Sequence, residues 1–241
     1  MKTRIICLLF GVLLVSPSIY AQNSTNKGTP IIENHPSELS TTNEEAKRLY
    51  DIGSSLIRDG KVEEAEKYLT DAIAIDPNFY EAMDHLGLVY KRMNRLSEAE
   101  NMYLESIKIT KENIVSYMNL ANIYSMQGNV PGFTEALLRA LAIDPNNPDP
   151  YFQLGNIFTL RKQFDLAIGF AKMAIERYNE DDDPVDLAVS YRMLGLNYFG
   201  IRDYENAITY LEKANLFFKD PGIQEIIEEL IANTRESQPA L

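Results

Sequence analysis

A 34-residue internal period is the feature that most constrains how this chain folds. At five places a small residue directly follows Leu or Ile; the first four of these pairs are spaced by 34 residues and the last by 40. Large apolar residues stand four positions before and three positions after each small residue, which places all of them on one helical face. The sequence therefore predicts five equivalent helices. The five pairs are Ile52-Gly53, Leu86-Gly87, Leu120-Ala121, Leu154-Gly155 and Leu194-Gly195.

A second helix is predicted in every repeat. Positions 12, 16 and 19 residues after each small residue are small, large and small in turn, again on one face of a helix. The exceptions are Phe133, where a small residue is expected, and Ala171, where a large one is expected. Gly60, Asn94 and Gly128 lie between the two helices of their repeats, where the turn needs a residue that tolerates positive φ. Each repeat is thus predicted to be a helical hairpin.

This pattern resembles the tetratricopeptide repeat family over residues 46 to 221, with 33 of 35 signature positions carrying an expected residue type. The resemblance implies an all-α fold, a right-handed α-solenoid of five antiparallel helix hairpins. No hairpin buries its apolar face alone, so stacking of the hairpins makes the core. The solenoid is expected over 43–236, with a frayed tail at 237–241. Its parts are repeats near 46–79, 80–113, 114–147, 148–181 and 188–221 and an amphipathic capping helix at 222–236.

The N-terminus has the layout of a secretory signal peptide over residues 1–21. Lys2 and Arg4 provide a basic start, residues 5–15 are apolar apart from Gly11, and the junction Ala21-Gln22 follows a plausible cleavage site. The apolar run is shorter than the roughly 20 residues that span a bilayer, although an uncleaved anchor is the alternative. Residues 22–42 are polar and contain two prolines, which predicts a disordered tether.

The net charge of −12, which becomes −14 when Lys2 and Arg4 are removed, argues against nucleic-acid and membrane-surface roles. A basic partner is permitted but not required, since acidity also favours solubility. Cys7 is the only cysteine and lies in the predicted signal peptide. The exported chain would then have no disulfide and would be held by its core alone. We expect a mature chain that does not insert into a membrane and is periplasmic or secreted.

No catalytic or metal-binding pattern is recognisable in the sequence. His35 and His85 are the only histidines, and neither a Gly-rich phosphate loop nor a serine-nucleophile elbow is present. The run from Asp181 to Asp183 lacks the alternating ligands and the Gly of a calcium loop, so a solvated loop is expected. We predict no enzymatic activity, no cofactor and no metal, and we expect His85 to be a hydrogen-bonding residue at the surface.

The concave side of the predicted solenoid is where a partner is expected to bind, because the first helix of each repeat lines it. The candidate groove residues are those on these helices that the signature columns do not use. They are Tyr50, Arg58, Leu88, Lys91, Arg92, Met118, Asn119, Asn122, Met126, Phe152, Asn156, Leu160 and Arg192.

Two features of this set point to peptide recognition. Asn122 and Asn156 occupy the same place in successive repeats, and a carboxamide can both donate to and accept from an extended backbone. The stretch from Asn119 to Asn122 also resembles the one with which family members grip peptides. Met118 and Phe152 are expected to offer apolar contacts beside them.

A basic group, formed by Arg58, Lys91 and Arg92, lies near the N-terminal end of the predicted groove. It can receive a carboxylate from a partner, or its long side chains can simply extend from the helix ends into solvent. The clamp by which family members hold heat-shock chaperones is missing, because its first-repeat sites are Tyr50 and Ser54.

These observations predict an exported, non-enzymatic adaptor or scaffold that binds a peptide or partner protein in its groove, in a cell-envelope assembly. Two alternatives remain open at this point: a structural homo-oligomer, and an accessory subunit of an exported enzyme or secretion machine. The sequence determines neither the partner nor the oligomeric state.

Overall fold

A computed structural model describes residues 39–178 and 184–236, and the regular secondary structure of these residues is α-helical throughout. Most helices begin where a polar residue caps the backbone or where Pro starts the first turn. The eleven helices are α3 (Glu44–Arg58), α4 (Val62–Ile75), α5 (Tyr80–Arg92), α6 (Leu96–Ile109), α7 (Ile114–Gln127), α8 (Val130–Ile143), α9 (Pro148–Leu160), α10 (Phe164–Ile175), α11 (Pro184–Gly200), α12 (Tyr204–Phe218) and α13 (Pro221–Glu236).

Several predicted segments lie outside the described residues. They are the signal peptide at 1–21, the tether up to residue 38, the acidic loop around Asp181–Asp183 and the tail at 237–241. These segments therefore remain predictions.

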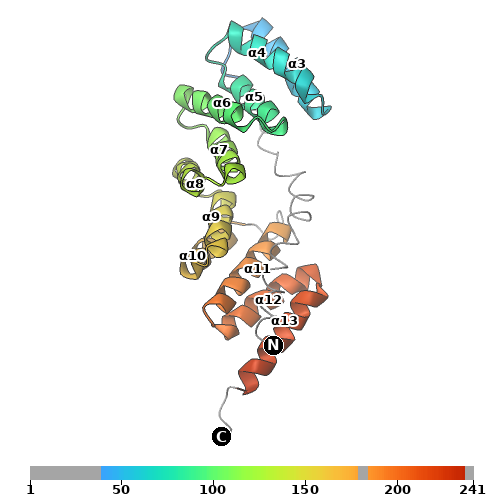
Figure 1. Ribbon diagram of the computed structural model, residues 1–241, viewed down its shortest axis with the longest axis vertical. Helices are drawn as coiled ribbons and strands as arrows, with labels where there is room; N and C mark the ends of the chain where they lie inside the picture. Colours follow the sequence, from blue (N-terminus) through green and yellow to red (C-terminus); the bar gives the residue numbers. More distant parts are fainter. Residues whose placement is uncertain (1–38, 179–183, 237–241) are drawn as a thin grey trace. The chain divides into compact units, whose positions relative to one another are not determined.

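Consecutive helices pack as antiparallel hairpins, and this confirms the predicted all-α fold (Figure 1). The pairs are α3 with α4, α5 with α6, α7 with α8, α9 with α10 and α11 with α12, and α13 follows as a single helix. The chain divides into two compact units at residues 145 and 146. The first unit contains α3–α8 and the second contains α9–α13, and each is described below by itself.

The turn inside each hairpin has one residue in the left-handed region of φ. The predicted turn residues Gly60, Asn94 and Gly128 have φ of 76°, 59° and 70°. In the last two hairpins the same position holds Lys162 and Arg202, with φ of 57° and 65°. The next residue in each turn donates its N–H to a carbonyl of the preceding helix, as Asp203 does to Tyr198 at 3.0 Å. Because this bond ends the first helix in all five hairpins, the turn is kept even where the residue is not Gly.

The small residues of the repeat allow the two helices of a hairpin to approach closely, as the sequence predicts. A Cβ at Gly87 would lie 2.8 Å from the ring of Tyr103, and one at Gly53 would lie 2.7 Å from Leu69. Both partner side chains are fully buried. The large residue of the second helix therefore packs against the bare backbone of the first.

Ala171, the exception among the large residues, is explained by the neighbouring hairpin. A Cβ at Gly155 would lie 2.8 Å from the terminal methyl of Met193, which belongs to α11. Met193 is 4% exposed and occupies the space over Gly155 that a large residue of the second helix fills in other repeats. The second unit thus fills this part of its core from the next repeat.

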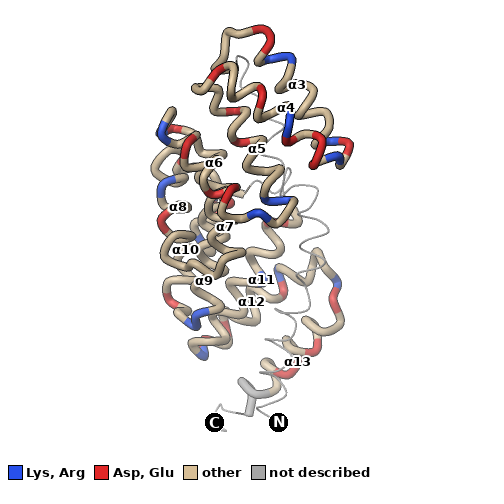
Figure 2. Tube along the Cα trace, turned by 45° about the horizontal axis from the view of Figure 1, so that its top comes forward, with Lys and Arg blue, Asp and Glu red and all other residues tan. Residues whose placement is uncertain are grey.

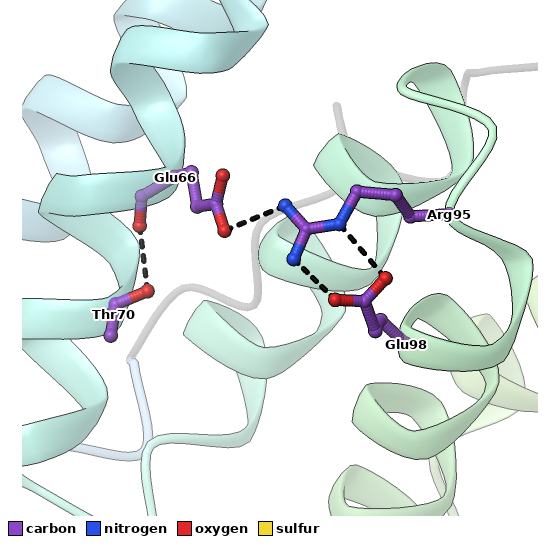
Figure 3. A network of polar contacts seen from close by, with 4 residues as sticks. All are labelled: Glu66, Thr70, Arg95 and Glu98. Atoms are coloured by element: carbon purple, nitrogen blue, oxygen red, sulfur yellow. Dashed lines mark hydrogen bonds and ion pairs between the residues drawn. The ribbon is translucent and has the colours of Figure 1, made fainter.

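An ion-pair network joins the first two hairpins of the first unit (Figure 3). Arg95 lies in the turn between α5 and α6; its guanidinium donates to Glu66 of α4 at 2.8 Å and also to both carboxylate oxygens of Glu98. The same guanidinium carbon lies 4.3 Å from the centroid of the Tyr90 ring. Three separate elements are therefore tied together by one side chain.

Both ends of the described repeats are covered. The predicted capping helix is observed as α13, whose buried residues Ile223, Ile226 and Leu230 join the core of the second unit. At the other end, Leu39 packs on the first core and Ser40 donates its backbone N–H to Glu81 at 2.9 Å. The prediction that the tether extends to residue 42 is therefore wrong for its last residues, because they make specific contacts with the first unit.

Candidate functional site

The first helices of the first unit, α3, α5 and α7, place nine of the predicted groove residues. Arg58, Arg92, Asn122 and Met126 are exposed, while Lys91 and Asn119 are half-buried. The remaining three are buried: Tyr50, Leu88 and Met118 are 1%, 2% and 7% exposed.

The expectation that Tyr50, Leu88 and Met118 present their side chains to a partner is corrected by this burial. Tyr50 and Leu88 belong to the core of the first two hairpins, and the Tyr50 ring lies 4.9 Å from that of Phe79. Burying these large apolar side chains stabilises the repeats more than exposing them would.

His85 is buried at 4% exposure, so the expectation of a surface residue is wrong. Its ring nitrogens face two hydroxyl groups of the preceding hairpin: Nδ1 lies 2.8 Å from Ser54 Oγ, and Nε2 lies 3.2 Å from Tyr50 OH. The imidazole can therefore exchange hydrogen bonds with α3 through both nitrogens. This pairing joins α3 to α5.

Asp84 is a buried carboxylate at the centre of a polar cluster that the sequence analysis missed. Asn113 Nδ2 donates to it at 2.7 Å, and the hydroxyl of Ser116 also donates to it. Ser106 Oγ lies 2.9 Å from Ser116 Oγ and accepts from Asn113 at the same distance. Burial raises the pKa of Asp84 to about 6, although these hydrogen bonds act in the opposite direction. The only available signal in the sequence was the presence of several polar residues at positions where neighbouring repeats are apolar.

The three cations of the predicted basic group, Arg58, Lys91 and Arg92, belong to the last turns of α3 and α5 in the first unit. Arg92 donates Nη1 to the carbonyl of Ile57 at 2.9 Å, so the last turn of α5 lies against the last turn of α3. Arg58 is the next residue after Ile57, and Lys91 precedes Arg92. Burial, and then the charge of Arg92, lowers the pKa of the half-buried Lys91 ammonium.

Helix α7 differs from its neighbours in having no charged residue (Figure 2). Asn119 is half-buried and Asn122 is exposed on this helix, and Met126, 51% exposed, lies near its end. Neither carboxamide hydrogen-bonds within the described residues. Both are therefore available to an incoming backbone.

In the second unit, α9 and α11 place the remaining predicted residues. Asn156 and Arg192 are half-buried and Leu160 is 59% exposed. The guanidinium of Arg192 lies 5.5 Å from the centroid of the Phe218 ring. Phe152 is only 4% exposed, so the expectation that it contacts a partner is corrected: it belongs to the core of this unit.

A buried amide in the second unit was also missed. Asn197 donates to Thr159 Oγ1 at 2.8 Å and to the carbonyl of Met193 at 2.7 Å, which ties α11 to α9. Its own Oδ1 has no hydrogen-bond partner among the residues that the structure describes. Because Asn197 is fully buried, it is a structural group of the core rather than a binding residue.

The part of the chain that the structure describes contains neither a group of side chains placed to bind a metal ion nor a helix able to span a membrane. Within residues 39–178 and 184–236, no group of three or more His, Cys, Asp or Glu side chains is placed to hold a metal ion. Among the same residues, no helix combines the length and the apolar character needed to cross a bilayer.

Comparison with solved structures gives the same fold. The MamA protein superposes with a TM-score of 0.63 at 22% identity, covering 82% of this chain and 98% of that one. YrrB, a tetratricopeptide repeat protein, superposes with a TM-score of 0.62 at 20% identity, covering 78% and 94%. A tetratricopeptide repeat protein from Parabacteroides merdae gives 0.65 at 17% identity, covering 78% and 73%. At these identities the likeness shows the fold alone.

Sequence comparison identifies the repeats themselves. A search of curated proteins found no significant match. Family models of the tetratricopeptide repeat match residues 46–79, 81–113, 114–143, 136–169 and 188–216, which together make up more than half of the chain. With the hairpin geometry described above, these matches show that the chain belongs to the tetratricopeptide repeat family of protein–protein interaction scaffolds.

Proposed function

We propose that this protein is an exported, non-enzymatic adaptor that binds an extended peptide or a segment of a partner subunit on the inner face of its repeats, in a cell-envelope assembly. The observation that carries the proposal is helix α7. It has no charge along its length, and it carries the exposed Met126 and the carboxamides of Asn119 and Asn122, which make no hydrogen bond within the described residues.

Carboxamides suit this role because each one offers two donors and an acceptor, which match the N–H and C=O groups of an extended chain. A methionine beside them adapts to side chains of different shapes. Asn156 repeats the amide on α9 of the second unit, where it is half-buried. The similar protein YrrB is described as having an unusual peptide-binding site, which is a precedent for peptide binding by this fold.

Export is proposed from the sequence of the first 22 residues. Lys2 and Arg4 precede the short apolar run, and Ala21-Gln22 provides the cleavage junction. N-terminal sequencing of the protein isolated from its native cells is expected to begin at or near Gln22. A full-length product retained in the membrane would contradict export as a free protein.

The two alternatives make different predictions about mass and partners. A structural homo-oligomer requires a solution mass that rises with concentration, whereas an adaptor is expected to be a monomer at all concentrations. An accessory subunit is expected to co-purify in a fixed ratio with one enzyme or secretion component. Crosslinking in the native envelope, followed by pull-down and mass spectrometry, identifies the partner in either case.

Calorimetric titration of that partner tests the binding face. Each hydrogen bond to a neutral backbone group contributes about 0.5–1.5 kcal/mol, so replacing Asn122 and Asn156 by Ala is expected to weaken binding by about 1–3 kcal/mol. Glu63→Ala on the exposed side of α4 is the control and is expected to leave the affinity unchanged. An unaltered dissociation constant in the double variant would place the binding surface elsewhere on the protein.

A further inference from the structure

The ends of α3, α5 and α7 form a surface of defined chemistry in the first unit. Arg58, Arg92 and Met126 each stand five residues after the small residue of their repeat, and all three are exposed. Successive first helices contact one another, so equivalent positions follow each other along the unit (Figure 1). With Lys91, which precedes Arg92, these residues make a row of three cations followed by an exposed thioether. We call this row the basic strip.

Arg92 of the basic strip lies close to Lys91 and to the backbone beside Arg58. The hydrogen bond from Arg92 to the carbonyl of Ile57 brings its guanidinium to the backbone beside Arg58. Lys91 is near enough to Arg92 for that charge to lower the pKa of its ammonium group, after the larger effect of burial. Because like charges repel, the fold has to hold Lys91 and Arg92 beside each other against this repulsion.

No carboxylate of the described residues pairs with these three cations. Elsewhere in the same unit, Lys47, Arg48, Arg95, Lys108 and Arg139 form ion pairs, whereas Lys61, Lys67 and Lys111 are single exposed cations without an ion pair among the described residues. The chain as a whole has a net charge of −12, so acidic groups are not scarce. A half-buried ammonium without a counter-ion is costly, and an external carboxylate would relieve that cost.

We propose that the basic strip binds an acidic segment of a partner protein, with two or more carboxylates on Arg58 and Lys91 and an adjacent apolar side chain on Met126. This rests on the proposed function and gives the chemistry of the partner. A nucleic acid is a poor occupant, because three cations in a strongly acidic chain do not make the extended basic surface that phosphate backbones require. The carboxylates can lie anywhere along the segment, so no free C-terminus is needed.

The test uses the full chain and a fluorescein-labelled peptide blocked at both ends, Gly-Ser-Asp-Glu-Asp-Leu-Leu-Gly. Two comparison peptides carry Asn and Gln in place of the acids, or Ser in place of both leucines. Fluorescence anisotropy at low and high salt measures each affinity. The acidic peptide is expected to bind more tightly than the neutral one, with a difference that shrinks in high salt. Loss of the leucines is expected to weaken binding to the wild type but not to Met126→Ser.

Charge-removing variants locate the site. An exposed ion pair changes affinity by a factor of about 1.4–5, so Arg58→Gln with Lys91→Gln is expected to weaken binding roughly 2- to 30-fold. The matched control removes two exposed, unpaired charges elsewhere, Lys67→Gln with Lys111→Gln, and is expected to have a clearly smaller effect. Arg92 is left in place because it caps α3. Should circular dichroism show that the double variant is misfolded, Arg58→Gln alone is expected to give a 1.4- to 5-fold loss.

Three results would overturn the proposal. Equal affinity for the acidic and neutral peptides would remove the charge argument, and equal weakening by the control pair would show a general effect of net charge. Self-association that the Arg58 and Lys91 variant abolishes, without binding of the acidic peptide, would assign the strip to a second copy of the chain. If the acidic peptide fails while Asn122→Ala still weakens binding of the captured partner, only this inference fails. If the peptide binds and Asn122→Ala has no effect, the proposed inner-face site fails instead.

Discussion

The glycines at the helix–helix contacts give a direct test of the packing, and Gly195 is the most demanding position. It lies inside α11 and packs against α12. A Cβ added there would lie 2.8 Å from Leu211 Cγ, 3.0 Å from the backbone nitrogen of Leu211 and 3.1 Å from the carbonyl oxygen of Ala207. Ordinary contacts between such atoms are about 3.5–4.0 Å. Two of the three neighbours are backbone atoms, so α12 itself would have to move.

The magnitude follows from two opposing terms. Inserting a methyl group into a well-packed core destabilises by about 1–3 kcal/mol. Ala in place of Gly inside a helix stabilises by about 0.5–1 kcal/mol. Gly169 provides the matched control in the same unit, because it also lies inside a helix, α10, and nothing lies within 4 Å of an added Cβ. Gly169→Ala is therefore expected to raise the free energy of unfolding by about 0.5–1 kcal/mol.

The comparison of Gly195→Ala with Gly169→Ala isolates the packing term, because the helix-propensity gain is common to both. Urea denaturation followed by far-UV circular dichroism is expected to show Gly195→Ala less stable than Gly169→Ala by about 1–3 kcal/mol. In a unit of 60–100 residues that corresponds to about 4–8 °C in Tm for each kcal/mol. Equal stability of the two variants would mean that α11 and α12 do not approach as closely as described here, and the small residues of the repeat would need another explanation.

Two further predictions concern local features of each unit. The folded-state pKa of Asp84, about 6, lies above its ordinary value of 3.8, so its ionisation opposes folding at neutral pH and this penalty disappears as pH falls through 6 toward 4. In urea titrations, the free energy of unfolding of the wild type relative to that of Asp84→Asn is therefore expected to be about 2–3 kcal/mol greater near pH 4 than near pH 7. A difference that does not change with pH would show that Asp84 is not buried as a carboxylate. Arg202 has φ of 65° in the turn between α11 and α12, a conformation that costs free energy for residues other than Gly. Arg202→Gly is therefore expected to stabilise the protein by about 1 kcal/mol in the same assay. A loss of stability would mean that the Arg side chain contributes more than its backbone conformation costs.

The repeat pattern predicted the hairpins because both helix formation and helix–helix contact require apolar and small residues at regular spacings along the chain. The spacing of Gly53 from Leu69, and of Gly87 from Tyr103, predicted that the two helices of each repeat approach closely. Lys162 was not recognised as a turn residue, because nothing in a Lys marks a position with positive φ.

The candidate site was predicted less completely. Asn122, Met126 and Arg92 are exposed on first helices, as a groove residue has to be. Tyr50 and Phe152 were expected on the same grounds, yet both are in cores. A position on a helical wheel gives the direction of a side chain, but its exposure depends on which neighbouring element covers that direction.

The sequence by itself determined the all-α class, the number of hairpins, the turn residues Gly60, Asn94 and Gly128 and the presence of a helix after the last repeat, because each is set by residues close together along the chain. Only the tertiary structure decided that Met193 fills the space left by Ala171, that Ser116 and Asn113 enclose Asp84, and that Arg92 reaches the carbonyl of Ile57. These contacts join different hairpins. Their partners are chosen by the way one repeat stacks on the next, and the spacing of residues within a single repeat does not encode that choice.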